Sequence, residues 1–211
     1  MISSQKKIIR FAIALCGFYL VLSIATHFCG DFLIRLQLPI YSAVINLASS
    51  ELQLDSIALK QRDGENRGKD DFSVKEVVAV VHNTQAMQFQ KGTMPANIPI
   101  KLSTPQGYPL QHPLIIFSIL LAWPYICGFK KLLLLLISVP FLLLVSAIDI
   151  PFVLLGSGYD LIYSTLEPQL IKSSWYIGYM DFLNGGGRIA LSIAAAILCI
   201  GLLARIFDKY A

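Results

Sequence analysis

The sequence predicts an α-helical integral membrane protein with four transmembrane helices and a small extracytoplasmic β-rich insertion between the first two. Three observations lead to this fold class. The chain of 211 residues is 55% hydrophobic and only 14% charged, whereas a soluble domain carries about 25% charged residues. Its apolar residues are gathered in four long runs, and the polar segment between the first two runs has the alternating pattern of strands.

The first apolar run, IIRFAIALCGFYLVLSIATHFC, lies within residues 1–29 and predicts the first transmembrane helix. It is long enough, because about 20 residues cross a hydrocarbon core of about 30 Å. The run is longer than the hydrophobic region of a signal peptide, and no small-residue cleavage site follows it. We therefore expect an anchor that is not cleaved.

Residues 30–50 predict an amphipathic interfacial helix. At about 100° of rotation per residue, its polar side chains fall within an arc of about 60°, and the remaining surface is apolar. Such a helix lies at the membrane surface or packs on another part of the protein, with a bend near Pro39. A direct extension of the first span is the alternative. The polar stripe consists of Asp31, Arg35, Ser42, Asn46 and Ser49.

Residues 51–112 predict a small extracytoplasmic β domain. The stretches ELQLDSIALK, FSVKEVVAVVHN and IPIKLS are rich in alternating and β-branched residues, so we expect an antiparallel sheet of two to four strands. TQAMQFQKGTMPANIP predicts a turn-rich connection, and the charged stretch QRDGENRGKDD predicts a solvated hairpin loop. The acids of that loop lack the spacing of a calcium site. They are Asp63, Glu65, Asp70 and Asp71.

Residues 113–150 predict two further spans joined as a tight hairpin. The apolar runs cover residues 113–129 and 132–150, and only Lys130 and Lys131 separate them. Pro124 and Pro140 lie inside these runs and should kink the helices.

Residues 151–188 predict an interfacial aromatic segment, and residues 189–211 predict the fourth span with a cytoplasmic C-terminus. The interfacial segment has few charges and five tyrosine or tryptophan residues, which suit the headgroup region of a bilayer. They are Tyr159, Tyr163, Trp175, Tyr176 and Tyr179.

The positive charges predict the orientation of the chain in the membrane. Basic residues precede the first run, separate the second from the third, and follow the fourth. With four spans, all three clusters lie on one side, which the positive-inside rule assigns to the cytoplasm. The expected protein is therefore a multi-pass protein of a bacterial inner membrane, with both termini cytoplasmic and residues 30–112 extracytoplasmic. The clusters are Lys6, Lys7 and Arg10; Lys130 and Lys131; Arg205 and Lys209.

The stretch FLNGGGR, residues 182–188, has the letters of a phosphate-binding turn, because Gly185, Gly187 and Ala190 match G-x-G-x-x-A. A dinucleotide site needs a buried strand before these glycines and a soluble helix after them. Here an aromatic interfacial segment precedes them and an apolar span follows. We therefore expect no nucleotide, and a turn that leads the chain back into the bilayer, with Arg188 at the headgroup level.

Four residues are candidates for chemistry. Asp149 is the only carboxylate inside an apolar run, so it is a candidate for an ion pathway, although a residue capping the end of the third span is the preferred interpretation. His27, Cys29 and Arg188 are expected near the outer membrane surface and have the chemical groups of a cysteine transpeptidase. Helix-end residues usually have local roles, and we expect no catalytic, cofactor-binding or metal-binding residues.

Composition and motifs argue against several classes of function. No basic patch interleaved with aromatic residues indicates nucleic-acid binding. The four cysteines lie in or beside apolar runs without C-x-x-C spacing, so neither a disulfide framework nor a zinc site is expected. His82 and His112 have no evident partner in the sequence, and we expect both to be solvated or locally bonded.

The segment HPLIIFSILLAWPYICGFKKLLLLLISVPFLLLVSAIDIP, with NGGGR further on, resembles the small inner-membrane proteins encoded with exosortases, the sorting transpeptidases of the bacterial envelope. The resemblance covers about residues 112 to 207. It implies an accessory role beside a larger membrane enzyme. Exosortases themselves carry a cysteine followed by arginine and histidine, whereas here Cys29 follows His27 and Arg188 lies far downstream.

We therefore expect a non-catalytic accessory or structural subunit of a larger envelope or membrane complex. Its partners would be membrane lipids and other integral membrane subunits, contacted through the extracytoplasmic domain and the spans. An exosortase-like envelope cysteine transpeptidase or protease is one alternative. A component of a small proton or ion pathway is another.

Overall fold

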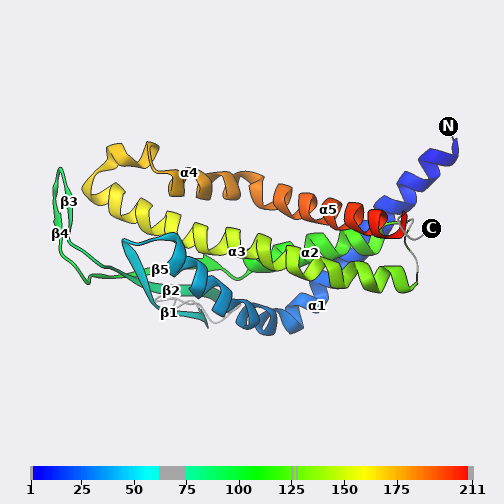
Figure 1. Ribbon diagram of the computed structural model, residues 1–211, viewed down its shortest axis with the longest axis horizontal. Helices are drawn as coiled ribbons and strands as arrows, with labels where there is room; N and C mark the ends of the chain where they lie inside the picture. Colours follow the sequence, from blue (N-terminus) through cyan, green and yellow to red (C-terminus); the bar gives the residue numbers. More distant parts are fainter. Residues whose placement is uncertain (1, 62–74, 125, 127, 209–211) are drawn as a thin grey trace, which may run out of the picture. The chain divides into compact units, whose positions relative to one another are not determined.

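The computed structural model describes residues 2–61, 75–124, 126 and 128–208. The predicted solvated hairpin loop with its four acids, residues 63–71, lies outside these residues. Along the chain the elements are α1 (Ile2–Ala48), β1 (Leu52–Gln61), β2 (Lys75–Asn83), β3 (Met87–Phe89), β4 (Gly92–Met94), β5 (Pro99–Pro105), α2 (Gly107–Ala122), α3 (Phe129–Leu166), η1 (Pro168–Lys172), α4 (Trp175–Phe182), η2 (Leu183–Gly187) and α5 (Arg188–Asp208) (Figure 1).

The chain forms two compact units. The helical unit consists of Met1–Gly30, Leu110–Ser146 and Gly187–Ala211. The sheet unit consists of Asp31–Pro109 and Ala147–Gly186. The segments predicted to be extracytoplasmic therefore belong almost entirely to one unit, and each unit is described separately below.

Within the described residues, three helical stretches are long and apolar enough to cross a membrane: Gln5–Ala48, Phe129–Leu166 and Trp175–Arg205. The prediction of a mostly helical protein with long apolar helices, and with a small antiparallel sheet between its first two helices, is confirmed. The remaining apolar helix, α2, has 16 residues, which extend over about 24 Å.

The stretch predicted as an amphipathic helix continues the first helix without a break. Of the two alternatives that the sequence left open, the structure shows the direct extension, with Pro39 inside α1. The last turns of α1 nevertheless pack as an amphipathic helix does. Tyr41 and Ile45 are fully buried in the core of the sheet unit, and the hydroxyl of Tyr41 donates a hydrogen bond to Gln37.

The predicted hairpin of the second and third spans differs from the structure at its boundaries. Helix α2 ends at Ala122 and α3 begins at Phe129, so Pro124 lies in the connection and does not kink a helix. This end follows from the proline, which disfavours helical geometry in the residue before it. Lys130 is in the first turn of α3, and the helix continues through Pro151 to Leu166.

The sheet has the order β1–β2–β5, and both pairs of strands are antiparallel. The register shifts between Leu54 and Ser56, so Asp55 forms a bulge in β1. A bulge adds one residue to one strand and reverses the parity of the side chains that follow. This explains why the apolar residues of β1 occupy even positions up to Leu54 and odd positions from Ile57.

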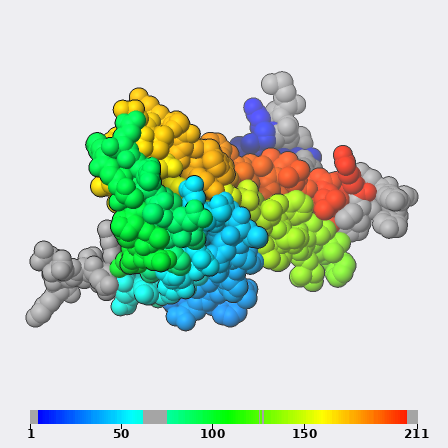
Figure 2. All heavy atoms as spheres, turned by 60° about the vertical axis from the view of Figure 1, so that its left-hand side comes forward, coloured from blue at the N-terminus to red at the C-terminus, as the bar shows by residue number. Residues whose placement is uncertain are grey.

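The connection before β5 contains a second, two-stranded element that the sequence did not predict. Strands β3 and β4 form a hairpin in which Met87 pairs with Met94 and Phe89 with Gly92. Three-residue strands carry too little alternation to be recognised by period. Figure 2 shows this hairpin (green) next to the segment that follows α3 (yellow to orange).

One face of the sheet packs on the helical segments of the sheet unit. The glycine Gly158 of α3 lies over the sheet, where an added Cβ would be 3.3 Å from Leu102. The two segments predicted to be extracytoplasmic therefore share one hydrophobic core. Its buried members are Tyr41, Ile45, Leu52, Ala79, Val81, Ile100, Leu102, Ile150, Leu154, Leu155, Tyr159, Ile162 and Ile177.

The helical unit has its own core, formed by α2, α5 and the first part of α3. Many large apolar side chains of this unit stay exposed, for instance Ile13 at 67% and Leu136 at 60%. Exposed apolar surface of this extent is typical of a helix bundle in lipid. The buried core residues are Ile116, Leu120, Leu134, Leu142, Val145, Ala195, Ala196, Cys199 and Leu203.

Two aspartates make side-chain contacts across elements of the sheet unit. Asp31, which follows the first predicted span, accepts hydrogen bonds from Lys75 at 2.5 Å and from Gln106 at 2.9 Å. The hydrogen bond from Lys75 is the main cause that lowers the pKa of Asp31 below its usual value. At the bulge, Asp55 lies 2.7 Å from the ring nitrogen Nδ1 of His82. His82 is therefore locally bonded, as predicted.

Candidate functional site

Two adjoining pockets open on the sheet unit, and Glu51 lines both of them. The first has a volume of about 500 Å³ and the second about 330 Å³. They share Ser50, Glu51 and Tyr163. We call the two pockets together the Glu51 cleft. Its lining comes from four segments that are far apart in the sequence: 48–51, 84–89, 159–163 and 173–176.

The position of the Glu51 carboxylate is fixed by a directional chain of hydrogen bonds. The hydroxyl of Tyr159 lies 2.9 Å from Oε2 of Glu51 and donates to it. Because a phenol has one proton, the hydroxyl of Ser49, 3.1 Å away, must then donate to Tyr159. The oxygen of Ser49 in turn accepts the backbone N–H of Leu52 at 3.0 Å. The start of β1 thus orders the carboxylate through two side chains.

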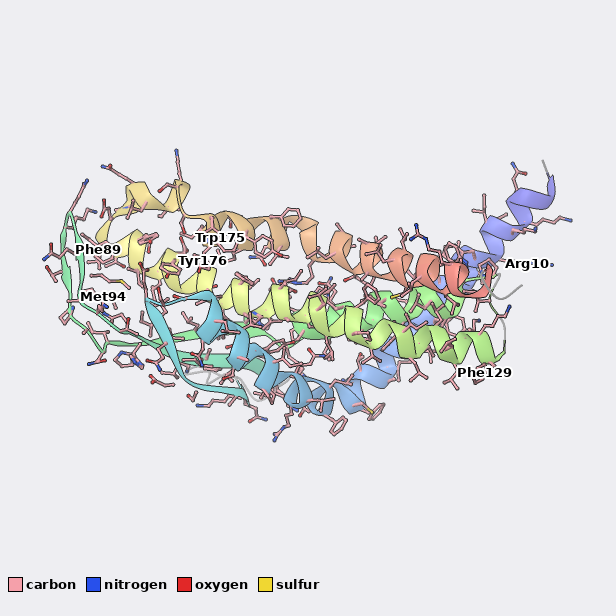
Figure 3. The ribbon with its side chains drawn as sticks, in the orientation of Figure 1. Arg10, Phe89, Met94, Phe129, Trp175 and Tyr176 are labelled. Atoms are coloured by element: carbon pink, nitrogen blue, oxygen red, sulfur yellow. The ribbon has the colours of Figure 1, made fainter. Side chains whose placement is uncertain are left out.

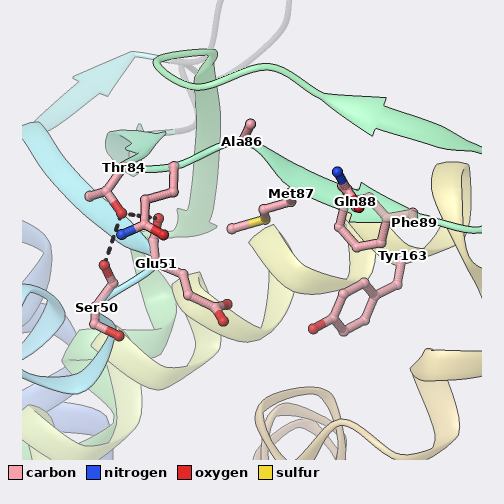
Figure 4. A pocket seen from close by; sticks show the side chains of 9 residues that line it. Ser50, Glu51, Thr84, Ala86, Met87, Gln88, Phe89 and Tyr163 are labelled. Atoms are coloured by element: carbon pink, nitrogen blue, oxygen red, sulfur yellow. Dashed lines mark hydrogen bonds between the residues drawn. The ribbon is translucent and has the colours of Figure 1, made fainter.

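The backbone beside Glu51 is also held in place. Thr84, which follows β2, donates its backbone N–H to the carbonyl of Glu51 at 2.9 Å. Its hydroxyl donates to the carbonyl of Ser50 at 3.0 Å. In Figure 4 the carboxylate of Glu51 and the hydroxyl of Tyr163 point into the same open space beneath Met87. The polar end of the cleft is therefore preorganised.

A continuous run of aromatic rings forms one wall of the cleft. Tyr163 and Tyr159 have ring centroids 5.6 Å apart, and Tyr159 stacks on Tyr176 at 4.8 Å. Trp175 follows at 4.6 Å from Tyr176, and its side chain is 57% exposed. Figure 3 shows Trp175 and Tyr176 together at the start of α4. The sequence analysis predicted these aromatic residues to be interfacial and did not predict that they are neighbours of Glu51.

The hairpin of β3 and β4 forms the opposite wall of the first pocket. Phe89 contacts Tyr163 edge to face, with centroids 6.2 Å apart. Met87 and Met94 pack against the core of the sheet unit. The hairpin is therefore attached to α3 and is not a free arm.

Asn83 anchors both ends of the segment that carries this hairpin. The residue is fully buried. Its Nδ2 donates to the carbonyls of Gln85 at 2.9 Å and Pro95 at 2.6 Å. Its Oδ1 accepts the backbone N–H of Ile98 at 2.9 Å. All polar atoms of this side chain are thus used to close the segment.

We expect Asn83→Ala to loosen the hairpin and the first pocket. The substitution leaves buried carbonyls and one N–H without partners, at a cost of about 1–3 kcal/mol. Hydrogen exchange of the full-length protein should become at least about tenfold faster in residues 84–98. Gln88→Ala, at an exposed position of β3, is the control. Unchanged exchange in Asn83→Ala would show that other contacts hold the hairpin.

The four candidate residues of the sequence lie in different environments. His27 and Cys29 are exposed on α1, and the ring of His27 contacts Phe28. Arg188, in the same unit, is only 3% exposed. Within the described residues, the thiol of Cys29 has no hydrogen bond to an imidazole or a guanidinium.

Arg188 was predicted to lie at the headgroup level, in the turn that leads the chain back into the bilayer. It begins α5 directly after η2, and its side chain is buried inside the protein. A buried guanidinium is retained only where polar partners compensate its charge.

Asp149 is more buried than expected, and it lies in the interior of a helix and not at its end. It is fully buried within α3, which continues for 17 residues after it to Leu166. It therefore does not cap the end of a helix. The sequence suggested a helix end because Pro151 follows, but proline is compatible with a helix when the freed carbonyl finds another partner.

The structure reveals one polar group in the helical unit that the sequence did not predict. His112 of α2 is fully buried, and its Nδ1 lies 2.8 Å from the hydroxyl of Ser192 in α5. Because that hydroxyl donates to the carbonyl of Arg188 at 2.9 Å, Nδ1 must carry the proton and donate to Ser192. His112 is thus a structural link between two apolar helices, and is neither solvated nor locally bonded.

Among the described residues, no group of three or more His, Cys, Asp or Glu side chains is arranged to hold a metal ion. The Glu51 cleft combines one hydrogen-bonded carboxylate, several hydroxyls and a wall of aromatic rings. Comparisons of the chain with protein-family models, with curated proteins and with solved structures found no match.

Proposed function

We propose that the protein is a non-enzymatic accessory subunit of a bacterial inner-membrane complex, in which the sheet unit contacts the partner. The observation that carries this proposal is that the chain divides into two compact units. Residues 31–109 and 147–186, separated by two apolar helical stretches, combine into one unit with its own core. A module of this size that is built on long apolar helices is suited to recognition at a membrane surface.

The proposed topology has four spans, with α2 as the shortest, and the sheet unit outside the cytoplasm. It is supported by the positive-inside rule. Arg10, Lys130 and Arg205 represent the three basic clusters, and all three residues belong to the helical unit. The short α2 can be accommodated by local thinning of the bilayer at a modest energetic cost.

Cysteine labelling tests this topology. In a variant without the four native cysteines, we expect Lys101→Cys to react with a membrane-impermeant maleimide in intact spheroplasts. Lys130→Cys should react only after the membrane is permeabilised. Both lysines are exposed, so access to the thiol is decided by the membrane and not by burial. Labelling of both positions from outside would contradict the four-span topology.

The outer face of the sheet is the surface that we assign to the partner. Ser56, Val80 and Lys101 lie side by side across the three strands. In the next row, Ala58 and Ser103 flank Val78, which is buried. This face is mixed in polarity, as interfaces of non-obligate complexes are. The opposite face is occupied by the core of the unit.

Isolation from native membranes tests the accessory role. The tagged full-length protein, with a photo-crosslinker at Lys101, should give a discrete crosslinked species that contains another integral membrane protein. A crosslinker at Lys172, an exposed lysine of η1, is the control position. The proposal fails if the protein is isolated in mild detergent as a lone species and no crosslink forms at Lys101.

The rival hypothesis, an envelope cysteine transpeptidase or protease, depends on Cys29. We expect Cys29→Ala to leave envelope-protein processing and the crosslink at Lys101 unchanged, because the exposed thiol has no base beside it within the described residues. Processing assays in a strain carrying only the variant measure this. Loss of processing with a folded Cys29→Ala protein would establish the enzymatic alternative.

A further inference from the structure

We propose that the Glu51 cleft is a binding site for an organic ammonium group. This inference goes beyond the accessory role and does not depend on it. It is carried by three independent features of the sheet unit: the charge of the lining, the end of α1 and the aromatic wall.

The lining of the cleft has a single charged group. Glu51 is the only ionisable acid or base other than tyrosine among the residues that line either pocket. Its carboxylate accepts one neutral hydrogen bond, from Tyr159, and no lysine or arginine of the described residues forms an ion pair with it. An ordered carboxylate without a cationic partner attracts a cation and repels an anion.

The C-terminal end of α1 adds partial negative charge at the same place. The helix ends at Ala48, and its last turn contains no basic residue. The final carbonyls of a helix carry partial negative charge and favour cations. The hydroxyl of Tyr176 donates to the carbonyl of Ala48. The partial negative charge that remains at the helix end would be compensated by the cationic ligand.

The aromatic wall selects an organic cation over a metal ion. The faces of tryptophan and tyrosine rings attract ammonium groups, and quaternary ammonium ligands are commonly bound by several such rings. Tyr163 lines both pockets, and Trp175 and Tyr176 line the second. A calcium ion would require about six to eight oxygen ligands, whereas the cleft has one carboxylate.

The volume of the cleft fits a ligand larger than the ammonium group itself. Pockets of about 300–1,000 Å³ hold small molecules, and the two parts of the cleft meet at Glu51. The ammonium group would lie between Glu51 and Tyr163. The neutral part of the ligand would extend towards Gln88 and Thr84 in the first pocket. Both a lipid headgroup and a soluble amine have this chemistry.

The intrinsic fluorescence of Trp175 provides a direct test. The chain has two tryptophans, so Trp123→Phe leaves Trp175 as the only reporter in the full-length protein. In detergent, choline chloride should change the emission in a saturable manner. Sodium chloride at equal ionic strength and 3,3-dimethylbutanol, a neutral isostere of choline, should not. Equal responses to choline and to the isostere would overturn the proposal.

A matched pair of carboxyl variants locates the site. Glu51→Gln keeps the shape of the side chain and removes its charge, so the dissociation constant of choline should rise about tenfold. Asp181→Asn removes an exposed carboxylate of the same unit that lines neither pocket, and it should bind choline as the parent does. Equal affinity in Glu51→Gln, with thermal unfolding unchanged, would overturn the assignment. If that variant is less stable, the comparison of choline with its isostere still decides.

Nanodiscs distinguish the two sources of the ligand. If a lipid headgroup occupies the cleft, phosphatidylethanolamine in the disc should shift the Trp175 emission and abolish the response to choline seen in phosphatidylglycerol discs. If the ligand is a soluble amine, choline should give the same response in both lipids. Either result supports the ammonium site and names its source, whereas no choline response in phosphatidylglycerol discs would overturn it.

Discussion

Replacing Gly156 with alanine is expected to cause a large loss of stability in the sheet unit. An added Cβ would lie 2.7 Å from the Cβ of Met180 and 2.8 Å from the carbonyl oxygen of Tyr176. Both contacts are much shorter than carbon atoms allow, and the second is with backbone. The two helices α3 and α4 must therefore separate, and overpacking of this kind costs about 1–3 kcal/mol.

Thermal unfolding of the full-length protein in detergent measures the effect of Gly156→Ala. Gly178→Ala in α4 is the matched control, because an added Cβ there has no atom within 4 Å. In a helix this control should be neutral or stabilising by up to about 1 kcal/mol. The ammonium response should also weaken in Gly156→Ala, because Tyr176 belongs to the cleft. Equal unfolding temperatures for the two variants would show that α4 can move without cost.

Much of the fold can be predicted from the sequence because two physical signals are strong and local. Long apolar runs identify the helices, and the β-branched stretch of β2 identifies the central strand. Even the bulge at Asp55 is visible, because the parity of apolar residues changes between Leu54 and Ile57. The predicted ends of the helices were less accurate. The sequence indicated an end before Pro151, whereas α3 continues through this proline to Leu166.

The candidate site could not be predicted, because its parts meet only through tertiary packing. Glu51 is one acid among many in a polar segment, and only the chain from Ser49 through Tyr159 distinguishes it. Its neighbours Tyr163 and Trp175 are predicted as aromatic residues of an interfacial segment, but their meeting at the cleft depends on the turn between α3 and α4. The same limit applies to Arg188, whose burial no local pattern indicates.

The second large effect is expected at Gly186, the residue that joins α4 to α5 within η2. Its φ is 114° and its ψ is −6°, a conformation that residues with a Cβ rarely adopt. FLNGGGR was predicted to form a turn that leads the chain back into the bilayer. It is a kink between two helices, and Gly186 is the last residue of the sheet unit along the chain.

Gly186→Ala should cost about 1–3 kcal/mol, because the strain cannot be relieved while both helices stay packed. Gly185→Ala is the adjacent control: its φ is not positive, and an added Cβ meets no atom within 4 Å. Thermal unfolding should separate the two variants clearly, with Gly185→Ala close to the parent. If both variants unfold at the same temperature, η2 adopts an ordinary helical path at little cost, and the kink is not a requirement of the fold.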